Sequence, residues 1–407
     1  MKRHYYSLLM EYIEFFPCVA ILGVRQCGKT TLLKKLPEIW KIFDLEKNSD
    51  FHLISQDPDL FLSLNPGHVA IDESQVIPEL FPALRVAIDL DRDKAGRYII
   101  TGSSSPELLR NISESLAGRV GIIELAPFSL SEAFSLPVSI FFELLLSGVK
   151  PEIFAKELTI RTNISDVHDY WLKGGYPEPW IKANKRFRKL WMQNYIKTYL
   201  NRDILSLFPG LNHQKYRLFL QMLSNLSGTV INYATVARTL GISQPTAREY
   251  FRIAHGTFVW RNIPPYERNA TKRIVKHPKG YLRDTGLLHF MLHQYSLSDL
   301  LVHPAMGFSW EALVIENILR GLNVLGTQFD YYYYRTGAGA EIDLVLEGEF
   351  GLLPVEIKHS QTVAPAELRG IRDFIKERNC PYGIVINNSD KVVLYDDCLI
   401  GIPFGVI

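Results

Sequence analysis

Short, fully apolar runs separated by polar turns dominate the pattern of the first third of the chain. The runs at 19–22, 69–71 and 98–100 do not alternate apolar with polar residues, which is typical of strands buried on both faces of a parallel sheet. Between the first two runs, residues 30–35 predict a helix and residues 40–45 predict another strand. The order strand, loop, helix, strand predicts a parallel α/β domain.

A different pattern follows in the middle of the chain, which is mostly helical. Residues 232–240 predict a helix, Gly241 a tight turn, and Ser243 the cap of a second helix. Two short strands are predicted after it, at 256–263 and 281–282. This order predicts a winged-helix unit, whose second helix fits the geometry for entering a DNA major groove. Docking of a protein is the alternative use of such a unit.

The last third of the chain returns to a mixed pattern of helices and strands. A long helix is predicted from Trp310 to Leu322. Later elements are three strands at 330–335, 341–346 and 352–357, a helix at 364–378 and a strand at 382–386. These pattern changes, in a chain of 407 residues, predict three domains at 1–165, 166–295 and 296–407.

Composition narrows the class of protein. Hydrophobic residues make up 47% and charged residues 22% of the chain, as in folded globular proteins. The net charge is +2, so only local basic runs speak for nucleic acid. The four cysteines, Cys18, Cys27, Cys380 and Cys398, occur singly, which fits a reducing compartment better than a disulfide framework or a zinc site. No signal-peptide pattern or spanning apolar run is present, so we expect a cytoplasmic protein without a membrane partner.

The most specific motif is GVRQCGKTT, between the first strand and the first helix. In such a phosphate-binding loop, backbone N–H groups face the phosphates, the lysine reaches the β- and γ-phosphate oxygens, and the threonine hydroxyl binds Mg²⁺. The predicted nucleotide-binding residues are Gly23, Arg25, Gln26, Cys27, Gly28, Lys29, Thr30 and Thr31. Thr30 is also a predicted magnesium ligand. The alternative is a chance match in an ordinary turn.

Two acidic residues follow the strand at 69–71. At the carboxyl end of a parallel strand, Asp72 is placed to hold Mg²⁺ through water, and Glu73 to orient the water that attacks the γ-phosphate. An acidic turn that starts a helix is the alternative.

Two further positions are candidates for the same site. Ser103 ends the strand at 98–100 and is placed to sense the γ-phosphate or the attacking water, with a simple serine turn as the alternative. Arg119 lies after that strand and is placed to stabilise transition-state charge in its own or a neighbouring subunit, which makes a homo-oligomer a candidate assembly. An exposed salt bridge is the alternative for Arg119.

Together, the phosphate loop, the IDE acidic pair, the TGSS strand end and the AGRV segment followed by LAPFSLSE resemble a known family. The chain looks like the prokaryotic AAA-type ATPases that carry a winged helix and a restriction-endonuclease-like C-terminal domain of unassigned function. In that family the ATPase portion covers roughly the first third of the chain. The resemblance implies that the bound nucleotide is ATP.

Two basic segments are candidates for contact with nucleic acid. Residues 182–189 contain five lysines and arginines and no acidic residue, and their alternative is a solvated helix face. In the segment 268–283 the basic residues are Arg268, Lys272, Arg273, Lys276, Lys279 and Arg283. This second segment lies within the predicted winged-helix unit, so it favours DNA as a partner.

A set of acidic residues and a lysine marks the last third of the chain. Residues two apart on a strand face the same side, so Glu356 and Lys358 project together, and a hairpin at 348–351 brings Asp343 beside Glu356. Two carboxylates can hold Mg²⁺ while the lysine polarises a water. The set resembles the restriction-endonuclease core, with Glu311 matching the acid of the preceding helix. The alternative is an ion-paired hairpin in an inactive fold used for interaction.

These expectations combine into one architecture and two functions. The chain is expected to be α/β, with an N-terminal parallel-sheet P-loop ATPase domain, a helical and winged-helix middle, and a C-terminal α/β restriction-endonuclease-like domain. The first function is an ATPase that uses ATP and Mg²⁺ and couples its nucleotide cycle to a DNA-binding, nuclease-like module. The second is a nucleotide-controlled switch that binds a protein partner through an inactive nuclease-like domain.

Overall fold

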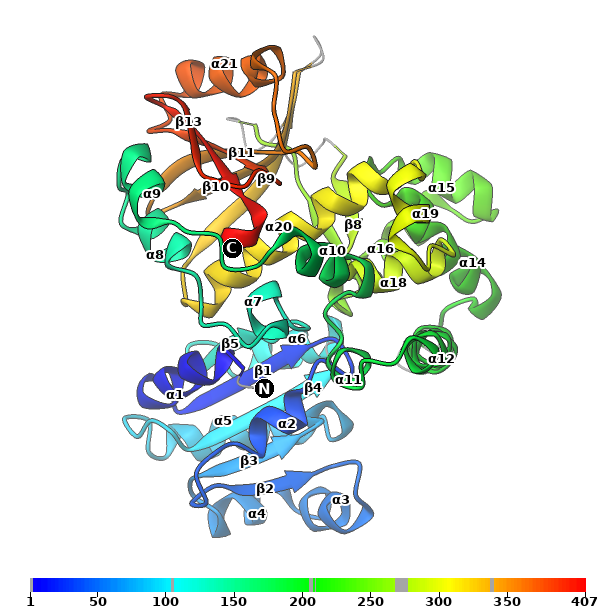
Figure 1. Ribbon diagram of the computed structural model, residues 1–407. Helices are drawn as coiled ribbons and strands as arrows, with labels where there is room; N and C mark the ends of the chain where they lie inside the picture. The colour runs from blue at the N-terminus through cyan, green and yellow to red at the C-terminus, as the bar shows by residue number, and fades with distance from the viewer. Residues whose placement is uncertain (1–2, 104–105, 205–207, 209, 268–276, 337–339) are drawn as a thin grey trace. The chain divides into compact units, whose positions relative to one another are not determined.

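The computed structural model describes residues 3–103, 106–204, 208, 210–267, 277–336 and 340–407 (Figure 1). The chain divides into two compact units. The first contains residues up to Phe128 together with Tyr176–Glu178 and Phe251–Val259. The second contains Ser129–Gly175, Pro179–Tyr250 and Trp260–Ile407. Residues 129–165, which we predicted to belong to the N-terminal domain, therefore group with the second unit.

A parallel sheet of five strands forms the centre of the first unit, in the order β2-β3-β4-β1-β5 (Figure 1). The strands are β1 (Cys18–Gly23), β2 (Lys41–Asp44), β3 (Val69–Asp72), β4 (Tyr98–Ser103) and β5 (Val120–Glu124). All six residues of β1 are buried, because this strand pairs with β4 on one side and β5 on the other. The predicted parallel α/β domain is confirmed.

Helices supply the apolar side chains that bury this sheet. They are α1 (Tyr5–Phe15), α2 (Lys29–Leu33), α3 (Asn48–Ser55), α4 (Pro58–Leu64), α5 (Leu80–Asp89) and α6 (Pro106–Ser115). Leu80 and Leu84 of α5 share one core cluster with Leu22, Ile71 and Ile100 from three neighbouring strands. Burial on this scale holds the carboxyl ends of the strands, where the phosphate loop begins, in a fixed frame.

The second unit begins with a helical stretch. Its elements are α7 (Leu130–Ala133), α8 (Ile140–Leu146), α9 (Pro151–Glu157), α10 (Ile164–Lys173), α11 (Pro177–Ile181), α12 (Lys185–Tyr195) and the π-helix η2 (Ile196–Asp203). The first two residues of α11 group with the first unit. At the end of α10, Gly174 has a φ of 72°, and a Cβ there would lie 2.3 Å from Asp284 Oδ1. Gly175 N donates a hydrogen bond of 2.8 Å to Asp284 Oδ2. The double glycine therefore allows a close approach to the chain around Asp284, which caps α18 (Thr285–Met291).

A small antiparallel sheet with three helices follows. The elements are α14 (His213–Leu226), β6 (Thr229–Val230), α15 (Tyr233–Leu240), α16 (Gln244–Gly256), β7 (Trp260–Ile263) and β8 (Lys279–Leu282), and the sheet order is β6-β8-β7. The end of α16, from Phe251 on, groups with the first unit. Asn232 caps α15 by accepting from two backbone N–H groups, and Gly241 ends the helix with a φ of 61°. Ser243 Oγ accepts from Thr246 N at the start of α16. The two helices and the glycine turn lie where the sequence predicts them.

A six-stranded mixed sheet completes the second unit, in the order β13-β14-β12-β11-β10-β9 (Figure 1). Its elements are α19 (Leu297–Val302), α20 (Met306–Val324), β9 (Phe329–Arg335), β10 (Glu341–Gly348), β11 (Gly351–Ile357), η3 (Pro365–Leu368), α21 (Arg369–Arg378), β12 (Gly383–Asn387), β13 (Val393–Asp396), β14 (Leu399–Pro403) and η4 (Phe404–Val406). Strands β9, β10 and β11 form an antiparallel meander, whereas β12 runs parallel to β11 after α21. Helix α20 begins four residues before the predicted start at Trp310.

Candidate functional site

The phosphate loop joins β1 to α2 and has the backbone that its glycines predict. Gly28 has a φ of 104° and Gln26 a φ of 68°, both in the left-handed region. Gly23 is required because a Cβ there would lie 2.2 Å from the Leu125 carbonyl oxygen. Cys27 is completely buried, and burial raises the pKa of its thiol. Cys27 therefore contributes packing and its backbone to the loop, and not a thiolate.

Lys29 is the first residue of α2 and its side chain is buried against the loop. Lys29 Nζ donates to the carbonyl oxygens of Gly23 at 3.2 Å and Val24 at 3.5 Å, and lies 4.0 Å from Glu73 Oε1. An ammonium held over the loop carbonyls is within the space where phosphate oxygens bind in such loops. The lysine and the acidic pair are thus neighbours, although they are 44 residues apart in the sequence.

The two acidic residues at the end of β3 lie in different surroundings. Asp72 is buried and accepts a hydrogen bond from Thr101 Oγ1. Glu73 has a φ of 56°, which is rare for a residue with a side chain, and its backbone N donates to Thr101 Oγ1 at 3.2 Å. Gln75 Nε2 donates to Glu73 Oε2 at 2.5 Å. One threonine on β4 therefore fixes both acids, and the glutamine orients Glu73.

The remaining predicted residues of this site lie at its edges. Ser103 pairs with Gly23 in the register of β4 and β1, at the loop, and its side chain is outside the described ones. Thr30 and Thr31 are exposed in α2. Arg25 Nη2 lies 3.4 Å from Glu46 Oε1. The structure thus brings the predicted phosphate-loop residues and the acidic pair to one end of the sheet.

Arg119 is paired within its own unit. Its Nε and Nη2 atoms donate to the two Asp89 carboxylate oxygens at 2.7 and 2.9 Å, and its Nη1 donates to the Ala117 carbonyl. This pair is exposed, as the alternative interpretation of Arg119 describes. The role of Arg119 in stabilising transition-state charge stays a prediction, and it requires the arginine to leave Asp89.

Arg3 and Thr101 are functional candidates that the sequence did not single out. Arg3 is buried, and its guanidinium donates to the Cys27 carbonyl and the Ala126 carbonyl, both at 2.6 Å. Arg3 therefore braces the phosphate loop from the start of the chain. Thr101 lies two residues before Ser103 on the same strand, and residues two apart on a strand face the same side. The sequence therefore contained a signal that Thr101 faces the same site as Ser103. No neighbouring residue in the sequence indicated a role for Arg3.

A second candidate site lies on the mixed sheet of the second unit. Leu344 of β10 pairs with Val355 of the antiparallel strand β11. Asp343 and Glu356 are the next residues on these two strands, so they are neighbours across the strand pair. The pairing of β10 with β9 shifts between Ile342 and Val345, and such an irregularity re-aims a side chain. Asp343 Oδ2 accepts from Ile357 N at 2.8 Å. The predicted meeting of Asp343 with Glu356 is therefore present in the fold.

The electrostatics of this site are those of buried carboxylates that repel one another. Burial raises the pKa of Asp343 well above its usual value, and Glu311 and Glu356 raise it further. Burial also raises the pKa of Glu356, whose Oε2 is buried and has no hydrogen-bond partner among the described residues. Burial on its own would lower the pKa of Lys358. Glu356 accepts a hydrogen bond from Lys358 Nζ at 2.7 Å and outweighs burial, so the pKa of Lys358 is raised. A cation beside Asp343 and Glu356 would relieve the carboxylate repulsion.

Glu311 is paired with two residues of β8, and its charge also acts on Asp343 and Glu356. Glu311 Oε2 accepts from Lys279 Nζ at 3.1 Å and from the Tyr281 hydroxyl at 2.8 Å. Lys279 Nζ also lies 2.9 Å from Glu341 Oε1. Over the described part of the chain, no group of three or more His, Cys, Asp or Glu side chains is arranged to hold a metal ion. The predicted metal role of Glu311, Asp343 and Glu356 stays a prediction.

The basic segment 268–283 extends in the sequence from after β7 to just past β8, and its two described lysine and arginine residues do not form the predicted DNA surface. Residues 268–276, with Arg268, Lys272, Arg273 and Lys276, lie outside the described residues. Lys279 and Arg283 are buried, and each pairs with a glutamate of α20, Lys279 with Glu311 and Arg283 with Glu316. These two side chains lie in the interior of the protein, where glutamates distant in the sequence form ion pairs with them.

Comparison with known proteins places this geometry in a family context. An AAA domain model matches residues 16–134, and two models for domains of unknown function, DUF8612 and DUF4143, match residues 164–298 and 306–406. Residues 16–134 are therefore an AAA-type ATPase domain. No helix among the described residues is long and apolar enough to span a membrane.

Two curated proteins match along nearly the whole chain. The uncharacterized proteins Mb2031c of Mycobacterium bovis and Rv2008c of Mycobacterium tuberculosis are each 34% identical, over 99% of this chain and 83% of their own length. Among solved structures, the Walker-type ATPase PABY2304 of Pyrococcus abyssi matches with a TM-score of 0.42 and 15% identity, over 72% of this chain and 95% of that chain. A STAND-class signal transduction ATPase of Pyrococcus horikoshii gives a TM-score of 0.26 and 16% identity, over 80% of this chain and 50% of that one.

Proposed function

We propose that this chain, which belongs to the protein family of Mb2031c and Rv2008c, hydrolyses ATP at the carboxyl end of its parallel sheet. The observation that carries the proposal is the contact between the loop and the acidic pair, in which Lys29 Nζ lies 4.0 Å from Glu73 Oε1. Glu73 accepts the proton of the attacking water as it approaches the γ-phosphate in line, and Lys29 offsets charge on the phosphate oxygens. Gln75 and the strained backbone of Glu73 hold that carboxylate in place.

Magnesium fits the residues of this site. The buried Asp72 carboxylate and the Thr30 hydroxyl are oxygen ligands of the kind that Mg²⁺ prefers, directly or through water. When bound, the ion neutralises charge on the β- and γ-phosphates. Thr101 keeps Asp72 oriented by donating its hydroxyl to the carboxylate.

We further propose that the nucleotide cycle acts on DNA through the second unit. The order helix, strand, helix, helix, strand, strand from α14 to β8, with the sheet order β6-β8-β7, supports a winged-helix assignment. In this unit, Ser243 and Gly241 form the turn before the candidate recognition helix α16. The helix, three-stranded meander, helix and parallel strand from α20 to β12 support a restriction-endonuclease-like assignment.

Coupling between ATP and DNA is tested by the rate of ATP hydrolysis. Adding duplex DNA should raise the rate of phosphate release at least about fivefold, the lower end of typical coupling between two sites. The stimulation should fall as salt rises, because phosphate contacts release counterions. An unchanged rate over a range of DNA lengths and sequences, with the ATPase itself active, would reject the coupling.

Cleavage of DNA is the finer proposal for the carboxylate site. Asp343 and Glu356 would hold Mg²⁺ on the scissile phosphate, and Lys358 would position and polarise the attacking water. Plasmid nicking in Mg²⁺ should fall at least about 100-fold in Glu356→Ala and in Lys358→Ala, the usual scale for losing an acid–base or charge-stabilising group. Glu347→Ala, an exposed position on β10, is the matched control and should nick normally. Equal nicking by all four proteins would assign the activity to a contaminant.

The second candidate function, a nucleotide-controlled switch that binds a protein partner, is favoured by Lys279. Its ammonium already offsets Glu311 and Glu341, as expected of an ion-paired fold that needs no metal. Under this alternative the purified protein neither nicks DNA nor responds to it in the ATPase assay. ATP hydrolysis then controls a docking surface on the second unit.

A further inference from the structure

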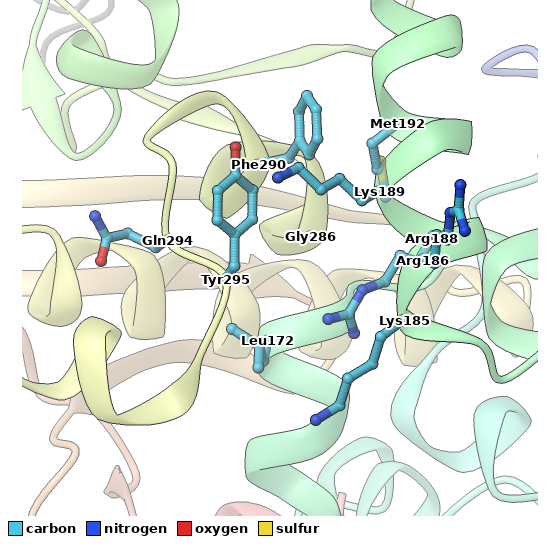
Figure 2. A pocket seen from close by; sticks show the side chains of 10 residues that line it. All are labelled: Leu172, Lys185, Arg186, Arg188, Lys189, Met192, Gly286, Phe290, Gln294 and Tyr295. Carbon is cyan, nitrogen blue, oxygen red and sulfur yellow. The ribbon is translucent and has the colours of Figure 1, made fainter.

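A pocket of about 350 Å³ lies within the second unit between α10, α12 and α18, outside both sites described above (Figure 2). Side chains from α12 line one side of it, and residues of α18 and the turn that follows line the other. Gly286, on its wall, can approach α10 only because it lacks a side chain: a Cβ there would lie 2.0 Å from the Lys173 carbonyl oxygen. The pocket is thus built by close packing of three helices, and its volume fits a small ligand.

Positive charge is concentrated on one wall. Lys185, Arg186, Arg188 and Lys189 all come from the first turns of α12, and none of the described residues lining the pocket is acidic. Asp169, on α10, is the acidic group whose charge reaches Arg188, and its own carboxylate already accepts from Lys173 Nζ. The wall therefore keeps an excess of positive charge.

This arrangement costs helix stability. Cations near a helix N-terminus face the positive end of the helix dipole, and like charges three or four residues apart repel, as Lys185 does with Arg188 and Lys189. Asn184 caps the helix, so its start is fixed at the point where the cations gather. A bound anion would reverse both effects, because it would interact favourably with the four side chains and with the dipole.

Arg188 supplies a second, independent indication of an anionic ligand. Its Nη1 atom is buried and has no hydrogen-bond partner among the described residues. Burial also lowers the pKa of its guanidinium, although Asp169 acts in the opposite direction. A buried guanidinium N–H without a partner is costly, and the oxygen atoms of a phosphate or a carboxylate are acceptors that arginine binds strongly.

Aromatic side chains form the opposite wall. Phe290 and Tyr295 line the pocket, and Tyr295 is 40% exposed as a residue. Lys189 Nζ lies 4.6 Å from the centre of the Tyr295 ring, so a cation and an aromatic ring are adjacent in the pocket. A phosphate and a planar base are linked at similar range within one nucleotide, and bases stack on such rings.

We propose that this pocket binds a nucleotide unit, with the α12 cations holding its phosphate and the Phe290 and Tyr295 side chains contacting its base. The unit is supplied by a free nucleotide or by a single strand of nucleic acid. The site shares no residue with the ATPase loop or with the carboxylate site, so it does not rest on hydrolysis or on cleavage.

Binding to the full-length protein tests the proposal, with EDTA present to remove divalent cations and the Lys29→Ala background to weaken the phosphate loop. The probe is a fluorescein-labelled oligomer of twenty thymidines, followed by anisotropy, with thymidine 5′-monophosphate as competitor. Arg188→Ala should weaken binding of the oligomer at least about tenfold, as expected for losing a charge-assisted hydrogen bond. Because Arg188 is half-buried, the exposed double variant Arg186→Ala/Lys189→Ala provides the same test without disturbing the interior.

Lys182→Ala is the matched control, since it removes one positive charge from the same basic run at an exposed position that does not line the pocket. It should change the affinity less than twofold. Displacement of the oligomer by the monophosphate would identify a free nucleotide as a ligand, and binding without displacement would identify the strand. Absence of binding by either probe, or equal weakening by Lys182→Ala and Arg188→Ala, would overturn the site while leaving the ATPase proposal untouched.

Discussion

Replacing Lys29 with alanine will reduce the release of phosphate from ATP at least about 100-fold, the usual cost of removing one charge-stabilising donor from a transition state. The ammonium lies over the loop carbonyls and within 4.0 Å of Glu73, so it is in position to contact phosphate oxygens that gain charge during transfer. Steady-state phosphate release in Mg²⁺, measured at saturating ATP, checks the rate. Nucleotide binding should also weaken, because the same contact exists before the reaction.

Lys35→Ala is the matched control for that experiment. Lys35 is exposed just beyond the end of α2, so its loss changes the charge of the protein equally and leaves the loop intact. Wild-type turnover in Lys35→Ala together with lost turnover in Lys29→Ala would support the assignment. If Lys29→Ala hydrolysed ATP at the wild-type rate, the loop would not be the hydrolytic site.

The parallel sheet and its loop were predictable from the sequence because their signals are local. Both faces of β1, β3 and β4 are covered, so each strand appears as an unbroken apolar run. The loop needs glycine at Gly28 for its left-handed backbone and at Gly23 for its close approach to Leu125. Each of these requirements concerns a single residue, so it is visible directly in the sequence motif.

The contacts that complete each site were not predictable, since they join segments far apart in the chain. Arg3 reaches Cys27 and Ala126 from the start of the chain, and no neighbouring residue marks it. Lys279 belongs to a run without acidic neighbours in sequence, yet the fold surrounds it with Glu311 and Glu341. A basic run therefore indicates an exposed patch only if no distant carboxylate reaches it, and the sequence does not contain that information.

A buried ion pair between residues far apart in the chain also gives the prediction with the largest expected change in stability. Glu316 of α20 is buried among three arginines, with Arg283 Nε at 3.2 Å, Arg320 Nη2 at 3.5 Å and both Glu316 oxygens accepting from Arg261. Glu316→Gln keeps the shape of the side chain but leaves three buried guanidinium groups without their central negative charge. Removing one partner from a buried ion pair costs about 3–5 kcal/mol, so the free energy of unfolding of the second unit should fall by about that amount. Urea unfolding followed by tryptophan fluorescence measures the change.

The dependence on pH separates this charge effect from a packing effect. Burial alone would raise the pKa of Glu316, but Arg261, Arg283 and Arg320 outweigh it and hold the pKa well below its ordinary value. A carboxylate with a lowered pKa stabilises the fold above its unfolded-state pKa of about 4.3, and this stabilisation is lost as the pH falls toward its folded-state pKa. The gap between wild type and Glu316→Gln should therefore be constant from pH 6 to 8 and should narrow below about pH 4.3. Exposed Glu347→Gln, the control, should change stability by less than about 0.5 kcal/mol. A gap of the same size at every pH would show that the loss of stability does not come from the charge of Glu316.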